Sequence, residues 1–281
     1  MTDHSSSLGT HVGRRALMRF ARAVRRQGEE FARRLGRPPV ADAVRQALAL
    51  PPAQMKSCPA STALAELLRG IEDAKDVPGV RDLFFLDGKP LPCWSEADTT
   101  LFDGWLCAEN YYPVYFCLYR VLTRQSRVTR LLEIGVRTGY QGVVFAKACQ
   151  GRAFYVGVDP DLYVRDGLQR AGDTFRILRE RLQHFEFCLI RGYSWDRDVE
   201  CSLSCSGPFD LVHIDGDHTL RGKLADLDLA RHLLARDGIV LVDDYDHQAS
   251  VADAIGRSLA LGWYREFAYY ATFRGLALLR A

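Results

Sequence analysis

The chain has 281 residues, of which 48% are hydrophobic and 26% are charged. This composition is typical of a globular protein and excludes an intrinsically disordered chain. Because 37 basic residues nearly balance 35 acidic ones, no overall field draws the molecule to nucleic acid or to an anionic membrane, and we expect neither as a partner. No apolar run approaches the roughly 18 residues of a membrane-spanning helix, and the polar start of the chain does not form a secretory signal.

Eight cysteines are scattered along the chain, and none forms a C-x-x-C pair. The closest two, Cys201 and Cys205, have no histidine at ligand spacing, which argues against a zinc site. The cysteines are also too sparse for a disulfide scaffold. We therefore expect reduced thiols and a cytoplasmic location, and the excess of arginine over lysine is typical of a bacterial protein from a GC-rich genome.

An arginine-rich stretch at residues 14–37 carries apolar residues at helical spacing, and Gly36 with Pro38 ends the pattern. We interpret it as an amphipathic helix that packs on the protein itself or on a second subunit, so that the N-terminal helices would support a homo-oligomer. A membrane- or nucleic-acid-binding arm and a targeting peptide are the alternatives for this stretch.

Residues 40–100 hold two short helical patterns and turn-rich segments without a chemical motif. The following stretch, 110–125, predicts a helix rich in tyrosine whose aromatic stripe we expect in the core, with its first tyrosines near the mouth of a pocket. We assign residues 1–124 to a helical N-terminal extension that serves substrate choice or oligomerisation.

The sequence pattern changes at about residue 125, where short apolar runs begin to alternate with helical patterns. The runs predicted as strands are 131–134, 154–158, 187–190, 211–214 and 239–242, followed by a helix at 249–261 and two strands at 264–270 and 272–279. Buried parallel strands joined by crossover helices have this pattern. The sequence therefore predicts one α/β domain over residues 125–281.

A glycine-containing turn follows the first predicted strand, in the segment Glu133-Ile-Gly-Val-Arg-Thr-Gly139. The dinucleotide fingerprint G-x-G-x-x-G needs a second glycine so that a pyrophosphate can approach the backbone. Here Arg137 stands at that position, which argues against a pyrophosphate and against an NAD-dependent oxidoreductase. The turn remains suited to a nucleoside without phosphates, although glycines alone also occur in ordinary βα turns.

The second predicted strand ends at Asp159, 24 residues after Gly135. A carboxylate at this place accepts hydrogen bonds from a ribose diol. The glycine turn and Asp159 together predict a nucleoside site.

Acidic residues follow two further strands. Asp215 ends the fourth, within His213-Ile-Asp-Gly-Asp-His218, and Asp243 and Asp244 end the fifth. Since carboxyl ends of neighbouring parallel strands meet at one edge of a sheet, we expect these carboxylates to converge. Crowded carboxylates repel each other unless a cation compensates, and hard oxygen ligands favour Mg²⁺ or Mn²⁺. Helix capping is the alternative role for one aspartate per strand.

These segments, in this order and spacing, resemble class I S-adenosylmethionine-dependent methyltransferases. The resemblance covers about residues 129–248 and is greatest to the metal-dependent O-methyltransferases of antibiotic biosynthesis, such as the macrocin, mycinose and aminocoumarin sugar enzymes, and the cephalosporin-hydroxylase-like group. It implies a Rossmann-like seven-stranded sheet of order 3-2-1-4-5-7-6 with only strand 7 antiparallel, S-adenosylmethionine as cofactor, and a hydroxyl of a small molecule as acceptor.

The resemblance also implies the roles of individual residues. The metal ligands would be Asp215, Asp243 and Asp244. The cofactor would contact the residues of the glycine turn, the ribose-binding carboxylate, the segment after strand three and the end of strand four: Glu133, Gly135, Val136, Arg137, Gly139, Asp159, Tyr193, Ser194 and Asp215.

Methyl transfer to a hydroxyl needs a base, because a sugar hydroxyl is a poor nucleophile at neutral pH. Three carboxylates would leave positions on an octahedral ion for two substrate oxygens, which favours a vicinal diol or catechol. Asp217 and His218 are both candidates for the base. The ordinary pKa of histidine suits neutral pH better, although His218 also fits the role of orienting a metal ligand.

Three other functions fit parts of the pattern. A metal-independent N-methyltransferase or a cyclase would keep the cofactor and change the chemistry. A non-catalytic nucleoside-binding protein would keep only the pocket.

Overall fold

A computed structural model describes residues 42–51, 61–72, 77–94, 108–125, 128–149, 151–162, 164–272 and 274–281 of the chain. The arginine-rich helix predicted at residues 14–37 lies outside the described residues. Residues from Val40 to Ala281 form one compact unit. None of the helices described is both long and apolar enough to cross a membrane.

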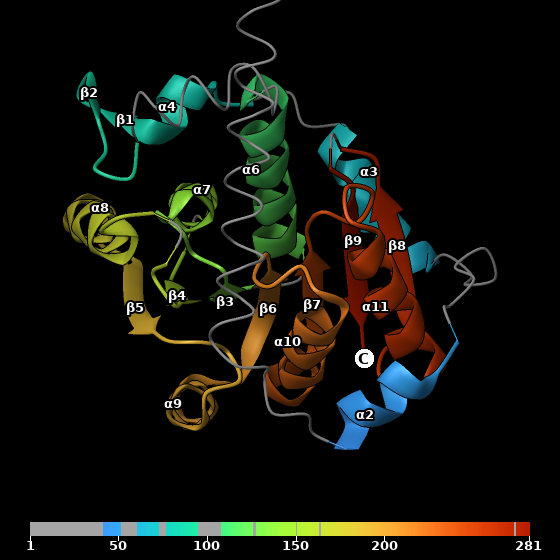
Figure 1. The fold of residues 1–281 in the computed structure, drawn as a ribbon. Helices are drawn as coiled ribbons and strands as arrows, with labels where there is room; N and C mark the ends of the chain where they lie inside the picture. The colour runs from blue at the N-terminus through green and yellow to red at the C-terminus, as the bar shows by residue number, and fades with distance from the viewer. Residues whose placement is uncertain are drawn as a thin grey trace, which may run out of the picture. The chain divides into compact units, whose positions relative to one another are not determined.

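A seven-stranded sheet forms the centre of this unit (Figure 1). Its strands, in chain order, are β3 (Arg130–Ile134), β4 (Ala153–Asp159), β5 (Phe185–Arg191), β6 (Phe209–Ile214), β7 (Leu234–Val242), β8 (Glu266–Tyr270) and β9 (Leu276–Arg280). The spatial order is β5-β4-β3-β6-β7-β9-β8. The first five strands pair in parallel, whereas β9 is antiparallel to both of its neighbours.

This order confirms the predicted sheet, 3-2-1-4-5-7-6 with a single antiparallel strand. Each predicted strand is present, and the structure extends several of them, whereas β8 and β9 begin at Glu266 and Leu276, later than predicted. The most extended is β7, which begins at Leu234 instead of residue 239. The extra residues read Leu-Ala-Arg-Asp-Gly and form no continuous apolar run, and the first four are at least partly exposed, so hydrophobicity alone could not locate them.

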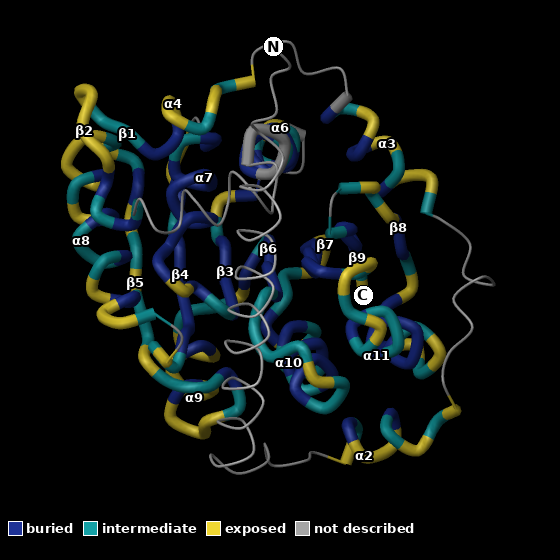
Figure 2. Tube along the Cα trace, turned by 45° about the horizontal axis from the view of Figure 1, so that its top comes forward, coloured by how far each residue is buried: buried dark blue, intermediate teal, exposed yellow. Residues whose placement is uncertain are grey.

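Helices cover both faces of the sheet. The helices in chain order are α2 (Asp42–Ala49), α3 (Thr62–Glu72), α4 (Val80–Phe84), α6 (Ala108–Gln125), α7 (Tyr140–Ala148), α8 (Gly167–Arg181), α9 (Arg197–Ser206), α10 (Leu220–Leu233) and α11 (Ala249–Ala260). The side chains of α3, α4, α6, α7 and α8 share one hydrophobic core, and those of α2, α9, α10 and α11 share the other. Figure 2 shows the central strands β3 and β6 as buried, whereas the exposed residues lie on the outer helices, the β1–β2 hairpin and the loops.

Two arginines, one buried and one partly buried, tie the segment before residue 125 to the sheet domain. Arg257 on α11 is 5% exposed and donates to the carbonyls of Ala47 and Leu48 at the end of α2. Arg170 on α8 donates likewise to the carbonyl of Cys93. The helices before residue 125 therefore pack as part of the same compact unit. A small hairpin of β1 (Phe85–Leu86) and β2 (Lys89–Pro90) accompanies them.

The tyrosine stripe of α6 lies in the core, as predicted. Tyr112, Tyr115 and Tyr119 are each at most 3% exposed. Tyr119 contacts His213 of β6, with 3.4 Å between its hydroxyl and Nδ1. The stripe therefore places α6 over the strand that ends at Asp215.

Candidate active site

The two turns that follow β3 and β6 lie against each other at the point where the strand order reverses. A Cβ atom added at Gly135 would lie 2.6 Å from the carbonyl carbon of Asp215 and 2.8 Å from the amide nitrogen of Gly216. Gly135 also has a φ of +98°, a conformation that L side chains rarely adopt. Only glycine therefore allows this approach, and in open α/β sheets ligands bind in the crevice at such a reversal.

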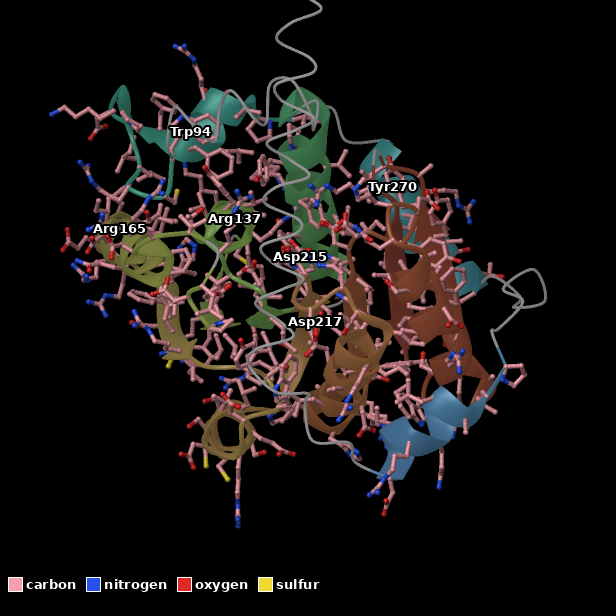
Figure 3. The ribbon with its side chains drawn as sticks, in the orientation of Figure 1. Trp94, Arg137, Arg165, Asp215, Asp217 and Tyr270 are labelled. Carbon is pink, nitrogen blue, oxygen red and sulfur yellow. The ribbon has the colours of Figure 1, made fainter. Side chains whose placement is uncertain are left out.

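Three side chains converge beside this turn. A carboxylate oxygen of Asp215, a ring nitrogen of His218 and a carboxylate oxygen of Asp244 all lie within 4.8 Å of one another. Asp215 follows β6, and Asp244 follows β7, the neighbouring strand. The predicted convergence of two strand ends is thus present, and Figure 3 shows Asp215 near the centre of the molecule.

The backbone conformation of Asp244 contributes to this convergence. Its φ is +63°, in the left-handed region that aspartate tolerates better than most residues. Its carboxylate is 4% exposed and lies 2.8 Å from Nε2 of His218. Asp243, the preceding residue and third predicted ligand, is fully buried at the end of β7. Its role as a ligand stays a prediction.

His218 supplies positive charge to the two carboxylates. Burial alone lowers the pKa of an imidazole, but contacts with Asp215 and Asp244 outweigh burial and raise the pKa of His218 to about 9. Burial likewise raises the pKa of Asp215, yet the contact with His218 brings it well below its ordinary value. When no ion is bound and only the protein's own side chains surround it, His218 is therefore protonated at neutral pH.

Asp217, the other candidate base, is engaged at the start of α10. Its Oδ1 accepts from the amide of Thr219 at 2.8 Å, and its Oδ2 accepts from the hydroxyl of Thr219 at 2.9 Å. Thr219 in turn caps α10 by accepting from the amide of Gly222. Asp217 thus holds the capping residue of α10 in place through one hydrogen bond at each of its carboxylate oxygens.

Arg274 is a site residue that the sequence interpretation missed. Its Nη1 lies 3.1 Å from Oδ1 and 3.3 Å from Oδ2 of Asp244. Arg274 precedes β9, and only the antiparallel pairing of β9 with β7 brings it to the acidic cluster. The resemblance to the methyltransferase family implied that strand 7 lies beside strand 5. Residues just before strand 7 could therefore have been expected near the end of strand 5.

The glycine turn between β3 and α7 is tightly packed, and its contacts with a nucleoside cofactor stay a prediction. Gly139 caps α7 with a φ of +90°, and a Cβ there would lie 2.9 Å from the ring of Phe175. Val136 is buried in the turn, and Arg137 has an exposed side chain and a φ of +54°. The two glycines therefore let the turn pack closely against Asp215 and Phe175.

Asp159 ends β4 beside this turn, as predicted. Its Oδ2 accepts from the amide of Arg137 at 2.8 Å, and its Oδ1 accepts from the amide of Asp161 at 2.6 Å. A carboxylate has about four acceptor positions, so some acceptor capacity remains for a ribose hydroxyl. Burial raises the pKa of Asp159, while these amide bonds act in the opposite direction.

The remaining predicted cofactor residues lie in two places. Glu133 is buried in β3 and accepts from the hydroxyl of Tyr155, and burial raises the pKa of Glu133 well above its ordinary value. Ser194 is buried after β5 and donates to Asp226 of α10. Tyr193 stacks on Trp195, with 4.8 Å between the ring centroids. Their cofactor contacts stay predictions.

The donor set also fits a divalent ion. Asp215 and Asp244 supply carboxylate oxygens, which Mg²⁺ and Mn²⁺ prefer, and the ligand atoms lie close enough to share one ion. Exposed acidic groups commonly gather without a metal, but Asp244 is almost fully buried. A buried carboxylate needs a compensating cation, which His218 and Arg274 now provide.

The sheet order, with its single antiparallel strand and the glycine turn at the reversal point, defines a class I methyltransferase fold. Comparison with known proteins agrees. Residues 132–245 match the family model of a methyltransferase domain. The resemblance to class I S-adenosylmethionine-dependent methyltransferases is thus confirmed for this part of the chain.

One curated relative is the O-methyltransferase ankF of Aspergillus thermomutatus, which is 27% identical over 141 residues. The match covers 49% of this chain and 53% of the relative, so the chain spans about half the length of that protein.

Among solved structures, the O-methyltransferase TomG of Streptomyces achromogenes, in complex with SAM, aligns with 16% identity and a TM-score of 0.45, covering 80% of this chain and 92% of TomG. An O-methyltransferase from Bacillus cereus in complex with SAH aligns with 15% identity and a TM-score of 0.43, covering 80% and 94%. The fold assignment rests on the sheet order and the family model.

Proposed function

We propose that the chain is an S-adenosylmethionine-dependent O-methyltransferase that acts, with Mg²⁺ or Mn²⁺, on a hydroxyl of a small molecule. The observation that carries the proposal is the convergence of Asp215, His218 and Asp244 beside the glycine turn at Gly135. A nucleoside on the turn and an acceptor over the carboxylates would then be neighbours. The relative named an O-methyltransferase and the methyltransferase-domain match support the reaction class.

The acceptor oxygen, the methyl carbon and the sulfur must lie in line, so the protein's first task is alignment. Asp159 would hold the ribose, and the turn at Gly135 would set the methionine part beside Asp215. When bound, a divalent cation lowers the pKa of a hydroxyl that coordinates it. Asp215 and Asp244, with Asp243 as the third predicted ligand, would hold that cation.

His218 is the residue best placed to take the proton at Nε2. To do so it must be neutral, and in the present arrangement its pKa of about 9 keeps it charged. Because Asp215 and Asp244 raise this pKa, a cation on the same carboxylates would lower it toward neutral pH. The base and the ion therefore depend on each other. Asp217 is the weaker candidate, since both of its oxygens accept hydrogen bonds from Thr219, the capping residue of α10.

A sugar or another vicinal diol, or a catechol, is the proposed acceptor, because two adjacent oxygens would fill the free positions of an octahedral ion. Such acceptors occur in natural-product biosynthesis, in agreement with the resemblance to antibiotic-tailoring enzymes. Cytoplasmic location and a homo-oligomer formed through the N-terminal helices remain expectations of the sequence.

One observation favours a second candidate, a metal-independent methyltransferase. Arg274 already balances charge on Asp244, so the cluster has a cation of its own. Transfer to an amine would need no ion, because a neutral amine is nucleophilic without one.

Calorimetry tests the proposal first. The protein is titrated with S-adenosylhomocysteine, with and without Mg²⁺, and acceptors with a vicinal diol or catechol are then assayed before and after EDTA treatment. We expect cofactor binding in both titrations and loss of activity in EDTA that Mg²⁺ restores. Activity that survives EDTA would select the metal-independent candidate, and no cofactor binding would overturn both.

A further inference from the structure

Both carboxylate oxygens of Asp244 already face cationic partners. Oδ1 and Oδ2 lie 3.1 and 3.3 Å from Nη1 of Arg274, and Oδ2 lies 2.8 Å from Nε2 of His218. The Asp244 side chain is almost fully buried, and that of Arg274 is 23% exposed. Any ion that binds to Asp244 must therefore share it with a guanidinium or displace that group.

The backbone holds Arg274 at this place. The amides of Asp246 and His247 both donate to the carbonyl of Arg274, at 2.9 and 3.3 Å, and the amide of Tyr245 donates to the carbonyl of Gly275 at 3.1 Å. The turn before β9 is thus attached directly to the loop that follows Asp244.

Gly275 makes this attachment tight. Its φ is +76°, and a Cβ there would lie 2.7 Å from the amide nitrogen of Asp246. The turn therefore fits closely against the loop, and the position of the Arg274 backbone is set by the fold. Motion of the side chain alone can move the guanidinium off Asp244.

We infer that Arg274 is an internal counter-cation that competes with the divalent ion for Asp244 and so sets the ion affinity of the site. The inference rests on the proposed function, because it concerns the ion proposed there. A guanidinium stays charged at every accessible pH, so its competition, unlike that of His218, does not depend on pH. Like charges at such short range repel strongly in a partly buried site. The ion therefore binds more weakly than the same carboxylates would hold it without Arg274.

The first test measures the dissociation constant of Mn²⁺ by calorimetry at fixed ionic strength, for the unmodified chain and for Arg274→Gln and Arg274→Met. We expect both variants to bind Mn²⁺ at least about ten-fold more tightly, while Arg274→Lys, which keeps the charge, stays closer to the unmodified chain. Arg280→Gln is the matched control. Arg280 is equally exposed and also pairs with one carboxylate, that of Glu266, so its loss should leave Mn²⁺ affinity unchanged.

A second measurement needs no variant. Phenylglyoxal modifies accessible arginines, and mass spectrometry of the digested protein reports the rate at Arg274. We expect saturating Mn²⁺ to speed modification of Arg274 several-fold, because the ion releases the guanidinium, and to leave the rate at Arg280 unchanged. An unchanged or slower rate at Arg274 would overturn the inference.

The outcomes separate the inference from the proposed function. Equal or weaker Mn²⁺ binding by both neutral variants, with clear binding by the unmodified chain, overturns the competition and leaves the proposed function intact. If no protein binds Mn²⁺ while all bind S-adenosylhomocysteine, both the ion of the proposed function and the inference fail. Binding by the neutral variants alone supports the inference most directly.

Discussion

The imidazole of His218 lies 2.8 Å from the carboxylate of Asp244 and thereby links the loop after β6 to the loop after β7. The same nitrogen lies 3.4 Å from Asp215. One side chain thus contacts two carboxylates that belong to neighbouring strands, and it is close enough to exchange a proton with a group bound between them.

Because of this geometry, we propose His218 and not Asp217 as the base. We expect His218→Asn to lower kcat by about 100-fold or more while S-adenosylhomocysteine binds normally. Asp217→Asn should lower stability by about 1 kcal/mol through weaker capping of α10 and leave most of the activity. Steady-state kinetics and urea unfolding of both variants measure these effects. The reverse pattern would assign the base to Asp217.

Asp244 is expected to serve the ion and not the cofactor. Asparagine has the same shape and tolerates the left-handed conformation, so Asp244→Asn should fold. It should weaken Mn²⁺ binding by at least about ten-fold and leave S-adenosylhomocysteine affinity nearly unchanged. Asp246→Asn, two residues further along in the same loop, is the control and should change neither. Calorimetry with Mn²⁺ and with S-adenosylhomocysteine measures both affinities. Normal Mn²⁺ binding by Asp244→Asn would show that Asp244 is not a ligand of the ion.

Gly135 is expected to be irreplaceable for steric reasons. Alanine there would meet the backbone of Asp215 and Gly216, so we expect Gly135→Ala to cost more than about 3 kcal/mol or to abolish cofactor binding. Gly262 is the matched control. It also has a positive φ, +69°, but a Cβ there would meet nothing within 4 Å. Gly262→Ala should therefore cost only about 1–2 kcal/mol, from backbone strain alone.

Thermal unfolding and S-adenosylhomocysteine titration of both alanine variants measure this difference. Similar behaviour of the two would mean that the contact between the turns after β3 and β6 does not determine the site.

Asp226 predicts a pH dependence of stability. Burial raises the pKa of Asp226 to about 7, although Lys223 and Ser194 act in the opposite direction. The ordinary pKa is 3.8, so between about pH 4 and pH 7 the unfolded chain releases this proton and the folded chain keeps it. Stability from this group is therefore present at low pH and is lost as the pH rises through 7, with a slope of up to about 1.4 kcal/mol per pH unit.

The asparagine in Asp226→Asn cannot titrate. We therefore expect the free energy of unfolding of this variant to fall less steeply between pH 5 and pH 7 than that of the unmodified protein. The comparison concerns the slope and not the absolute stability, since asparagine also leaves buried Lys223 with less compensation. Urea unfolding at several pH values measures both proteins. An identical slope in the two would show that Asp226 ionises normally.

Much of the fold followed from local patterns in the sequence. Apolar runs such as the one that ends at Ile134 predicted the strands, because a strand buried on both faces must be continuously hydrophobic. The sequence also located the turn from Gly135 to Gly139 and the carboxylates at the ends of β4, β6 and β7. Once the strands are predicted, the residues that directly follow each strand are known from the order of the chain. The sheet order itself came from resemblance to a family and not from periodicity.

The chain alone thus determined the strands, the crevice at their carboxyl ends, and the residue types available there. Tertiary structure decided which of those residues meet. Asp217 and His218 are neighbours in the chain, yet one bonds to Thr219 at the start of α10 and the other contacts Asp244, because the direction of each side chain depends on the loop conformation. Arg274 reaches Asp244 only through the antiparallel return of β9, and contacts between distant segments leave no local trace in the sequence.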